Sequence, residues 1–149
     1  MPSKKNLILI FTLNDCKYAV EIAYLIEVVE DIRISSNSDL DECLGLIQFR
    51  ENAIPLFNIK SRLELDDNVK KAYTVVVIRA CDELIAIPID SVNVVEELAD
   101  SILEFPDIIL KNKGIISYIY EWKDEFVYVF NLDLLLGKVI SELKAQRQS

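Results

Sequence analysis

The chain has 149 residues, 52% of them hydrophobic, and a formal net charge of −9, from 16 Lys and Arg against 25 Asp and Glu. That charge repels phosphate backbones, which argues against nucleic-acid binding, and every apolar run is shorter than the ~20 residues that span a bilayer. The absence of histidine excludes His-dependent catalytic triads, and three widely spaced cysteines (Cys16, Cys43 and Cys81) predict free thiols in a cytoplasmic protein with no metal and no cofactor.

The first part of the chain predicts short β-strands. Residues 7–13 form a β-rich apolar run, and Asn and Asp at residues 14–15 supply a turn before residues 18–21. Residues 22–29 place apolar side chains at helical spacing, so we expect a short helix before or within an extended return strand. The Ser, Asn and Asp cluster at residues 35–41 predicts a loop.

Residues 46–49 and 53–57 predict a β-hairpin around Arg50, with Pro55 at an edge or a bulge. Arg50 is a cation at a turn of an acidic protein. Arginine is favoured at protein interfaces because its planar fork makes several directional bonds while its stem covers apolar surface. The alternative is a turn arginine that pairs with the adjacent Glu51.

The charged residues 64–68 predict a boundary in the middle of the chain. Residues 73–79 are rich in Val and Ile and predict a buried strand, and residues 81–83 form a turn into the next strand, 84–88. Residues 98–113 are irregular and predict a long loop.

The last third predicts another hairpin, from residues 115–120 and 126–131, and then a helix. Asn131 can cap this helix, Gly137 can divide it, and Lys144 and Arg147 suit its C-terminal dipole. This helix has an apolar stripe, which either covers the core or docks on another chain. The stripe follows helical spacing at Leu132, Leu135, Leu136, Val139, Ile140 and Leu143.

An internal repeat is the most informative feature of the chain. Residues 18–30 align with residues 85–97 at an offset of 85 − 18 = 67, with acidic and apolar positions shared. Each copy continues to a glycine and closes on a Phe-Asn pair: Gly45 with Phe57-Asn58, and Gly114 with Phe130-Asn131. Two similar β-rich units offer two related faces with a groove between them, which suits a scaffold better than a catalyst.

Known catalytic patterns are missing from the sequence. The three glycines form neither a GxGxxG motif nor a P-loop. Acid pairs such as Asp39/Asp41 and Glu96/Glu97 have no pattern of converging ligands around them, so we interpret them as solvated surface charge. The sequence therefore predicts that the protein is not an enzyme.

The segment 45–59 carries a family resemblance. Gly-Leu-Ile-Gln-Phe-Arg followed by Ile-Pro-Leu-Phe-Asn-Ile resembles the signature of the CheW family of chemotaxis adaptors. The order of the remaining elements is similar over roughly residues 6–137. The chain departs from the family pattern at Glu51, which replaces the usual glycine, at Gln48 and Asn58, which replace the usual Asn and Asp, and near Leu40, where proline is frequent.

The resemblance implies a mainly β fold of two packed five-stranded SH3-like β-barrel lobes, with short helices and a C-terminal helix. The whole of residues 1–149 would be one CheW-like domain. Lobe one would cover about 14–71 and lobe two about 72–136, and the N-terminal strand and C-terminal helix would pack across both.

The resemblance also implies a non-catalytic adaptor that couples the cytoplasmic helical hairpin of a chemoreceptor to the regulatory domain of a chemotaxis histidine kinase. The protein would be cytoplasmic, recruited to membrane receptor arrays without inserting into the membrane. The implied receptor groove comprises Leu25, Glu27, Val28, Gln48, Arg50 and Glu51, and the implied kinase contacts are Ile54, Asn58 and Lys60.

Two other hypotheses stay open at the level of sequence. One is a CheW-like scaffold or competitor that binds a kinase in a non-motility pathway without receptor contact. The other is a pair of barrels that binds a small ligand or an oligonucleotide, which the charge of −9 disfavours.

Overall fold

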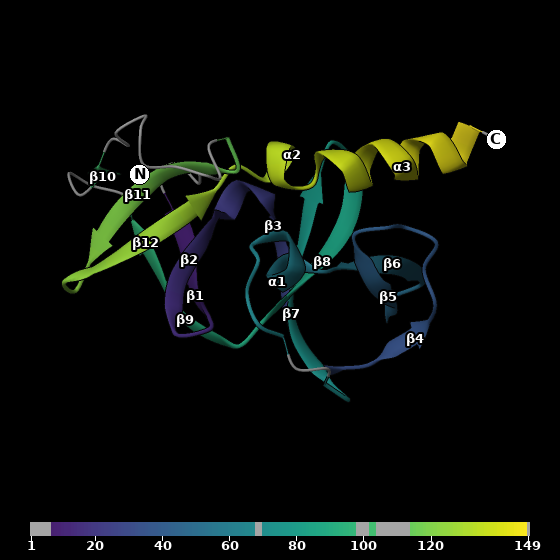
Figure 1. Ribbon diagram of the computed structural model, residues 1–149, viewed down its shortest axis with the longest axis horizontal. Helices are drawn as coiled ribbons and strands as arrows, with labels where there is room; N and C mark the ends of the chain where they lie inside the picture. Colours follow the sequence, from purple (N-terminus) through teal and green to yellow (C-terminus); the bar gives the residue numbers. More distant parts are fainter. Residues whose placement is uncertain (1–6, 68–69, 98–101, 104–113, 149) are drawn as a thin grey trace. The chain divides into compact units, whose positions relative to one another are not determined.

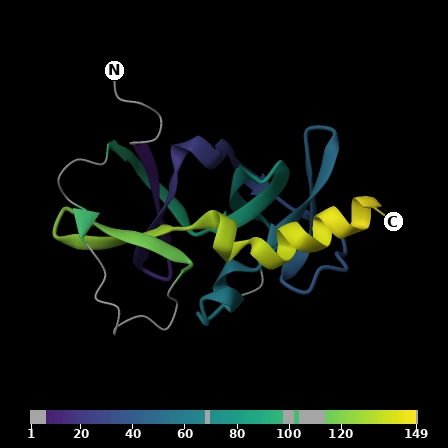
Figure 2. The ribbon, with the colours of Figure 1, turned by 90° about the horizontal axis from the view of Figure 1, so that it is seen from above.

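The computed structural model describes residues 7–67, 70–97, 102–103 and 114–148 (Figures 1 and 2). The chain divides into two compact units, here called unit 1 (Met1–Tyr24 with Ser91–Gly137) and unit 2 (Leu25–Asp90 with Lys138–Ser149). Each unit contains one sheet of six strands within the described residues. This confirms the mainly β fold class with short helices and a C-terminal helix.

The sheet of unit 1 has the order β10-β11-β12-β2-β1-β9. Neighbouring strands are antiparallel except β12 and β2, which are parallel. Its strands are β1 (Leu7–Leu13), β2 (Cys16–Glu21), β9 (Ser91–Glu97), β10 (Ile102–Leu103), β11 (Ile116–Trp122) and β12 (Glu125–Phe130). The predicted loop over residues 98–113 lies outside the described residues, apart from β10.

The sheet of unit 2 has the order β3-β7-β8-β6-β5-β4, and here β6 and β8 are the parallel pair. Its strands are β3 (Leu25–Ile32), β4 (Ile34–Ser36), β5 (Cys43–Phe49), β6 (Asn52–Phe57), β7 (Tyr73–Ala80) and β8 (Glu83–Ile89). Each sheet thus has five strands of six to eight residues and one of two or three.

The two sheets have the same topology. Each consists of an edge strand, an antiparallel hairpin, a parallel step, a second hairpin and a short strand. Strands β1 and β2 of the first sequence copy lie in unit 1 beside β9 to β12 of the second copy, whereas β7 and β8 of the second copy join β3 to β6 in unit 2. The repeat is therefore real, but the copies exchange their first two strands, and the expected lobes 14–71 and 72–136 each mix strands of both units.

Backbone chemistry repeats with the topology. The turns β1–β2, β7–β8 and β11–β12 each have two central residues with positive φ, such as Asn14 (47°) and Asp15 (67°), the pattern of a type I′ turn. The turn β5–β6 differs, because Arg50 has φ 54° and Glu51 is not among the described residues with positive φ. Glu51, which replaces the family's usual glycine, therefore does not adopt the left-handed backbone conformation that favours glycine.

Short helices follow the second hairpin of each unit. Asn58 accepts a hydrogen bond from the Ser61 amide at the start of α1 (Ile59–Arg62), and Asn131 accepts one from the Leu134 amide at the start of α2 (Leu132–Leu135), both at 3.3 Å. The predicted cap at Asn131 is confirmed, and so is the division near Gly137, where α3 (Gly137–Gln148) begins.

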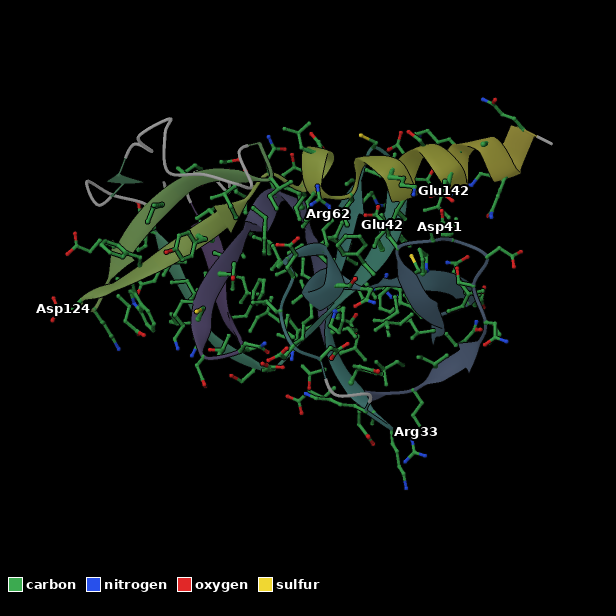
Figure 3. The ribbon with its side chains drawn as sticks, viewed as in Figure 1. Arg33, Asp41, Glu42, Arg62, Asp124 and Glu142 are labelled. Atoms are coloured by element: carbon green, nitrogen blue, oxygen red, sulfur yellow. The ribbon has the colours of Figure 1, made fainter. Side chains whose placement is uncertain are left out.

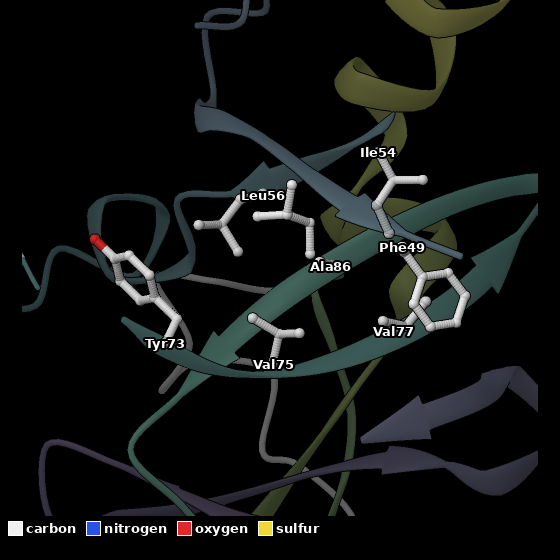
Figure 4. Packing of buried hydrophobic residues seen from close by; sticks show 8 residues of the cluster. Phe49, Ile54, Leu56, Tyr73, Val75, Val77 and Ala86 are labelled. Carbon is white, nitrogen blue, oxygen red and sulfur yellow. The ribbon is translucent and has the colours of Figure 1, made fainter. Parts of the chain in front are cut away.

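The predicted helix over residues 22–29 takes the form of a 3-10 helix, Ile22–Tyr24, before the extended strand β3. The core of unit 2 lies beside this strand. Tyr73, Val75 and Val77 of β7 pack against residues of the second hairpin and β8 (Figure 4). The core members are all buried: Ile47, Phe49, Ile54, Leu56, Tyr73, Val75, Val77 and Ala86.

Candidate functional site

Arg50 and Glu27 form an ion pair on the surface of unit 2. The Arg50 Nη2 donates to Glu27 Oε1 at 3.0 Å, and the two side chains are 64% and 47% exposed. Glu27 lies on the edge strand β3 and Arg50 in the β5–β6 turn. The alternative partner expected from the sequence, Glu51, is not the residue that the guanidinium binds in this pair.

The Arg50 guanidinium also stacks above a buried ring. Its Cζ lies 4.8 Å from the centroid of Phe49, the last residue of β5. Phe49 is 5% exposed and packs near Ile54 and Val77 at one end of the core in Figure 4. A cation above an aromatic face gains about 0.5–1 kcal/mol at an exposed site. The buried Phe49 ring thus restrains the Arg50 side chain, while the charged guanidinium stays accessible.

The six residues implied as the receptor groove all belong to unit 2. We call this set the Arg50 surface: Leu25, Glu27, Val28, Gln48, Arg50 and Glu51. Leu25 and Val28 are half-buried on β3, and Gln48 and Glu51 are exposed beside Arg50. The structure therefore brings two apolar side chains of an edge strand and a set of polar turn residues onto one unit.

The three implied kinase residues have different environments. Ile54 is 3% exposed and belongs to the core, and Asn58 is the cap of α1, so neither offers a free side chain. Lys60 donates to Asp90 Oδ1 at 2.8 Å, and Lys70 lies 3.5 Å from the same oxygen. Lys60 is thus the one charged residue of the three, and its ammonium group is paired with Asp90.

A charged pocket of about 230 Å³ lies between α1 and the segment that leads into β5. Three of its lining residues, Asp41, Glu42 and Arg62, are labelled in Figure 3. Arg62 pairs with Glu42 at 3.7 Å, and Lys138 of α3 pairs with Asp41 at 3.2 Å. Burial, and then the nearby Glu142 and Glu42 carboxylates, raise the pKa of the Cys43 thiol to about 12. In the part of the chain that the structure describes, no group of three or more Cys, Asp or Glu is placed to hold a metal.

Sequence reasoning missed Glu83. It was assigned to a turn, but the turn comprises Cys81 and Asp82, and Glu83 is the first residue of β8, with 0% exposure. Two basic residues of α3 neutralise it, Lys144 and Arg147. No local pattern signals this pairing, because the partners lie more than sixty positions along the chain, at separations of 61 (144 − 83) and 64 (147 − 83) residues.

Comparison with protein families identifies the chain. The model of the CheW-like domain matches residues 7–139, which span both units. The protein belongs to the CheW-like family. This is the family of chemotaxis adaptor and scaffold proteins that the Gly45–Arg50 signature resembles.

A solved CheW structure supports the fold. The crystal structure of the scaffolding protein TtCheW from Thermoanaerobacter tengcongensis matches with a TM-score of 0.78 and 22% identity, covering 91% of this chain and 93% of that one. No curated protein sequence matches the chain. Among the described residues of this CheW-like protein, no helix has the length and apolar character needed to cross a membrane.

Proposed function

We propose that this CheW-like protein is a non-catalytic signalling adaptor that couples the cytoplasmic tips of chemoreceptors to the regulatory domain of a chemotaxis histidine kinase. One observation carries the proposal to this chain: the exposed Arg50–Glu27 pair, fixed above the buried Phe49 ring at the position of the family signature. The proposed location is the cytoplasm, at membrane receptor arrays.

The Arg50 surface suits a helical partner. An amphipathic helix that docks on a protein presents apolar anchors on one face and polar residues beside them. Leu25 and Val28 offer partly covered apolar side chains, and the charges of Glu27 and Arg50 can set the register of the helix. The pair is solvent-exposed, so exchanging it for partner contacts costs little, since such pairs contribute only ~0–1 kcal/mol.

Reversal of charge at Arg50 tests the receptor contact. Arg50→Glu should weaken binding of a chemoreceptor cytoplasmic hairpin fragment by about 1–3 kcal/mol, as loss of an interface arginine does. It also places two carboxylates together at Glu27. Calorimetric titration of the fragment measures the change. Arg33→Glu is the matched control, because Arg33 is an exposed arginine of the same unit, between β3 and β4 (Figure 3).

The double variant Glu27→Arg/Arg50→Glu keeps the intramolecular pair but reverses its direction. If the receptor reads the charges, the double variant stays weak. If the pair merely shapes the turn, the double variant recovers binding. An Arg50→Glu protein that binds the receptor fragment as tightly as wild type contradicts the assigned role.

Binding to the kinase regulatory domain is measured separately. We expect Lys60→Glu to weaken it and Arg50→Glu to leave it unchanged, since Lys60 and Arg50 have separate ion-pair partners in Asp90 and Glu27. Kinase binding without receptor binding in the wild-type protein would instead establish a kinase scaffold of a non-motility pathway. Folded protein that binds neither partner would refute the adaptor proposal.

A further inference from the structure

Glu83 is the charged residue that the structure buries. Within the described parts of the chain it is the one polar or charged residue in the buried class, at 0% exposure. A buried carboxylate is strongly unfavourable unless cations and hydrogen bonds compensate it. The residues that neutralise Glu83 therefore control whether the β7–β8 end of unit 2 can stay closed.

Both compensating cations come from α3. Arg147 Nη2 donates to Glu83 Oε1, and Lys144 Nζ lies 3.6 Å from Glu83 Oε2. Lys144 also donates to the Cys81 carbonyl oxygen at 2.9 Å, in the turn that precedes β8. Positions 144 and 147 are three residues apart, so both side chains leave the same face of the helix.

Apolar burial along α3 fades toward its C-terminus. Val139 and Ile140 are buried, Leu143 is partly covered, and residues 144–148 are exposed. The CheW-like domain match ends at residue 139, before these basic residues. Beyond Ile140, α3 is thus attached to unit 2 mainly by charge, with Leu143 as its one partly covered apolar side chain among the described residues.

A cavity of about 230 Å³ lies beside this contact. Leu143 and Arg147 form part of its wall, opposite residues of β6 that include Ile54 and Pro55. Glu83 also lines it, and its Oε2 atom has no hydrogen-bond partner, only the Lys144 ammonium at 3.6 Å. The carboxylate is therefore compensated by one hydrogen-bonded cation and one more distant cation, so its neutralisation depends on both basic residues of α3.

We propose that residues 141–148 of α3 are a releasable ionic latch, in which Lys144 and Arg147 close over Glu83 and cover the cavity beside β6. Release of the latch exposes the carboxylate and the β6 wall, on the strand that follows the Arg50 turn. The latch is formed by residues of this chain alone, so it would operate whichever partners the protein binds. Because two of its three charged groups are partly exposed, it weakens as salt screens the attraction.

Hydrogen exchange of the full-length protein, followed by mass spectrometry, tests the latch. We expect the amides of residues 141–148 to exchange roughly tenfold faster in Arg147→Ala and in Glu83→Gln than in wild type, because weaker closing raises the open population. In wild type, the same amides should exchange faster in ~1 M salt than in ~0.05 M salt. The Debye length is above ~10 Å at the lower salt concentration and about 3 Å at the higher one, so the attraction is screened more strongly there. Lys138→Ala is the control: it removes the exposed pair with Asp41 at the start of α3 and should leave this exchange unchanged.

The amides of Val75 and Val77 in β7 serve as an internal measure of folding. Unchanged exchange there, together with faster exchange over 141–148, supports a local latch. Equal acceleration of β7 and α3 would overturn it, because Glu83 would then hold the sheet itself. Exchange over 141–148 that changes with neither salt nor the two variants would also overturn it.

Discussion

Units 1 and 2 each have a cation above an aromatic ring at one end of the core, but the acidic residue of the edge strand contacts the cation in one unit and the ring in the other. In unit 2, Arg50 lies over the Phe49 ring at 4.8 Å, and in unit 1, Lys123 lies over the Trp122 ring at 4.9 Å. Both aromatic residues end a strand and both cations begin the following turn. The repeat therefore preserves a cation above a ring at the same topological position.

The two units differ in what the acidic residue on the edge strand binds. In unit 2, Glu27 of β3 binds the cation, Arg50. In unit 1, Glu96 of β9 accepts a hydrogen bond from Trp122 Nε1 at 3.0 Å instead. Unit 2 thus presents a fixed pair of opposite charges, whereas unit 1 uses its acid to hold the ring. One framework can therefore keep its packing while the acid at this position forms an exposed ion pair in unit 2 and a hydrogen bond to a ring in unit 1.

Strand register shows how far the likeness extends. Ala19 pairs with Ile10 across β1–β2 and with Val129 across the parallel step. Ala86 does the same with Val77 and Leu56. A small residue at the centre of each sheet lets the larger neighbours converge, which explains why the two cores have matching members.

Breaking either core gives the largest expected effect. Val77→Asp in unit 2 and Ile10→Asp in unit 1 each bury an unpaired carboxylate, which costs several kcal/mol. Because the copies exchange strands, we expect each variant to lower the melting temperature of both units together. Circular dichroism should then show one unfolding transition. Val92→Asp, at a 42% exposed site of β9, is the control and should melt like wild type. Two separate transitions in either core variant would show that the units fold independently.

Local patterns predicted what local chemistry determines. The hairpins, the Asn131 cap and the division near Gly137 follow from turn residues and helix spacing, and the structure confirms them. The repeat also predicted two similar units.

Non-local contacts were beyond the sequence. The exchange of β1 and β2 with β7 and β8 depends on which sheet edge each hairpin meets, and a repeat is equally compatible with both arrangements. Arg50 pairs with Glu27, 23 residues away, rather than with its neighbour Glu51, and the burial of Glu83 depends on α3. A resemblance to a known family supplied the Arg50 surface, which composition alone did not.

The two repeat glycines, one in each unit, offer an intermediate test. At Gly45 of unit 2, an added Cβ would lie 2.6 Å from Ile34 Cγ2 and 3.0 Å from the Ser36 carbonyl oxygen. Gly114 of unit 1 has φ 105°, and among the described residues an added Cβ would meet Leu134 alone, at 3.5 Å. The first glycine is needed for space and the second for backbone conformation, so Gly45→Ala and Gly114→Ala should each cost about 1–3 kcal/mol for different reasons.

Second-site changes separate these reasons. Ile34→Ala should recover part of the stability lost in Gly45→Ala, measured by urea denaturation, because it removes the nearest clashing atoms. Leu134→Ala should recover nothing in Gly114→Ala, since the strain lies in the backbone. Equal rescue of both variants would show that the two glycines have the same role.

The smallest expected effect concerns the cysteines and leaves folding intact. Cys16 of unit 1 is exposed, whereas Cys43 of unit 2 is partly covered and has its pKa raised to about 12, chiefly by burial. Thiolate is the reactive form, so at pH 8 iodoacetamide should modify Cys16 well before Cys43, as peptide mass spectrometry can follow. Comparable rates in the native protein would contradict this environment, and denaturant supplies the control in which the rates converge. Because folding raises this pKa, the thiol favours the native state below pH 9, and that contribution disappears as the pH rises toward about 12.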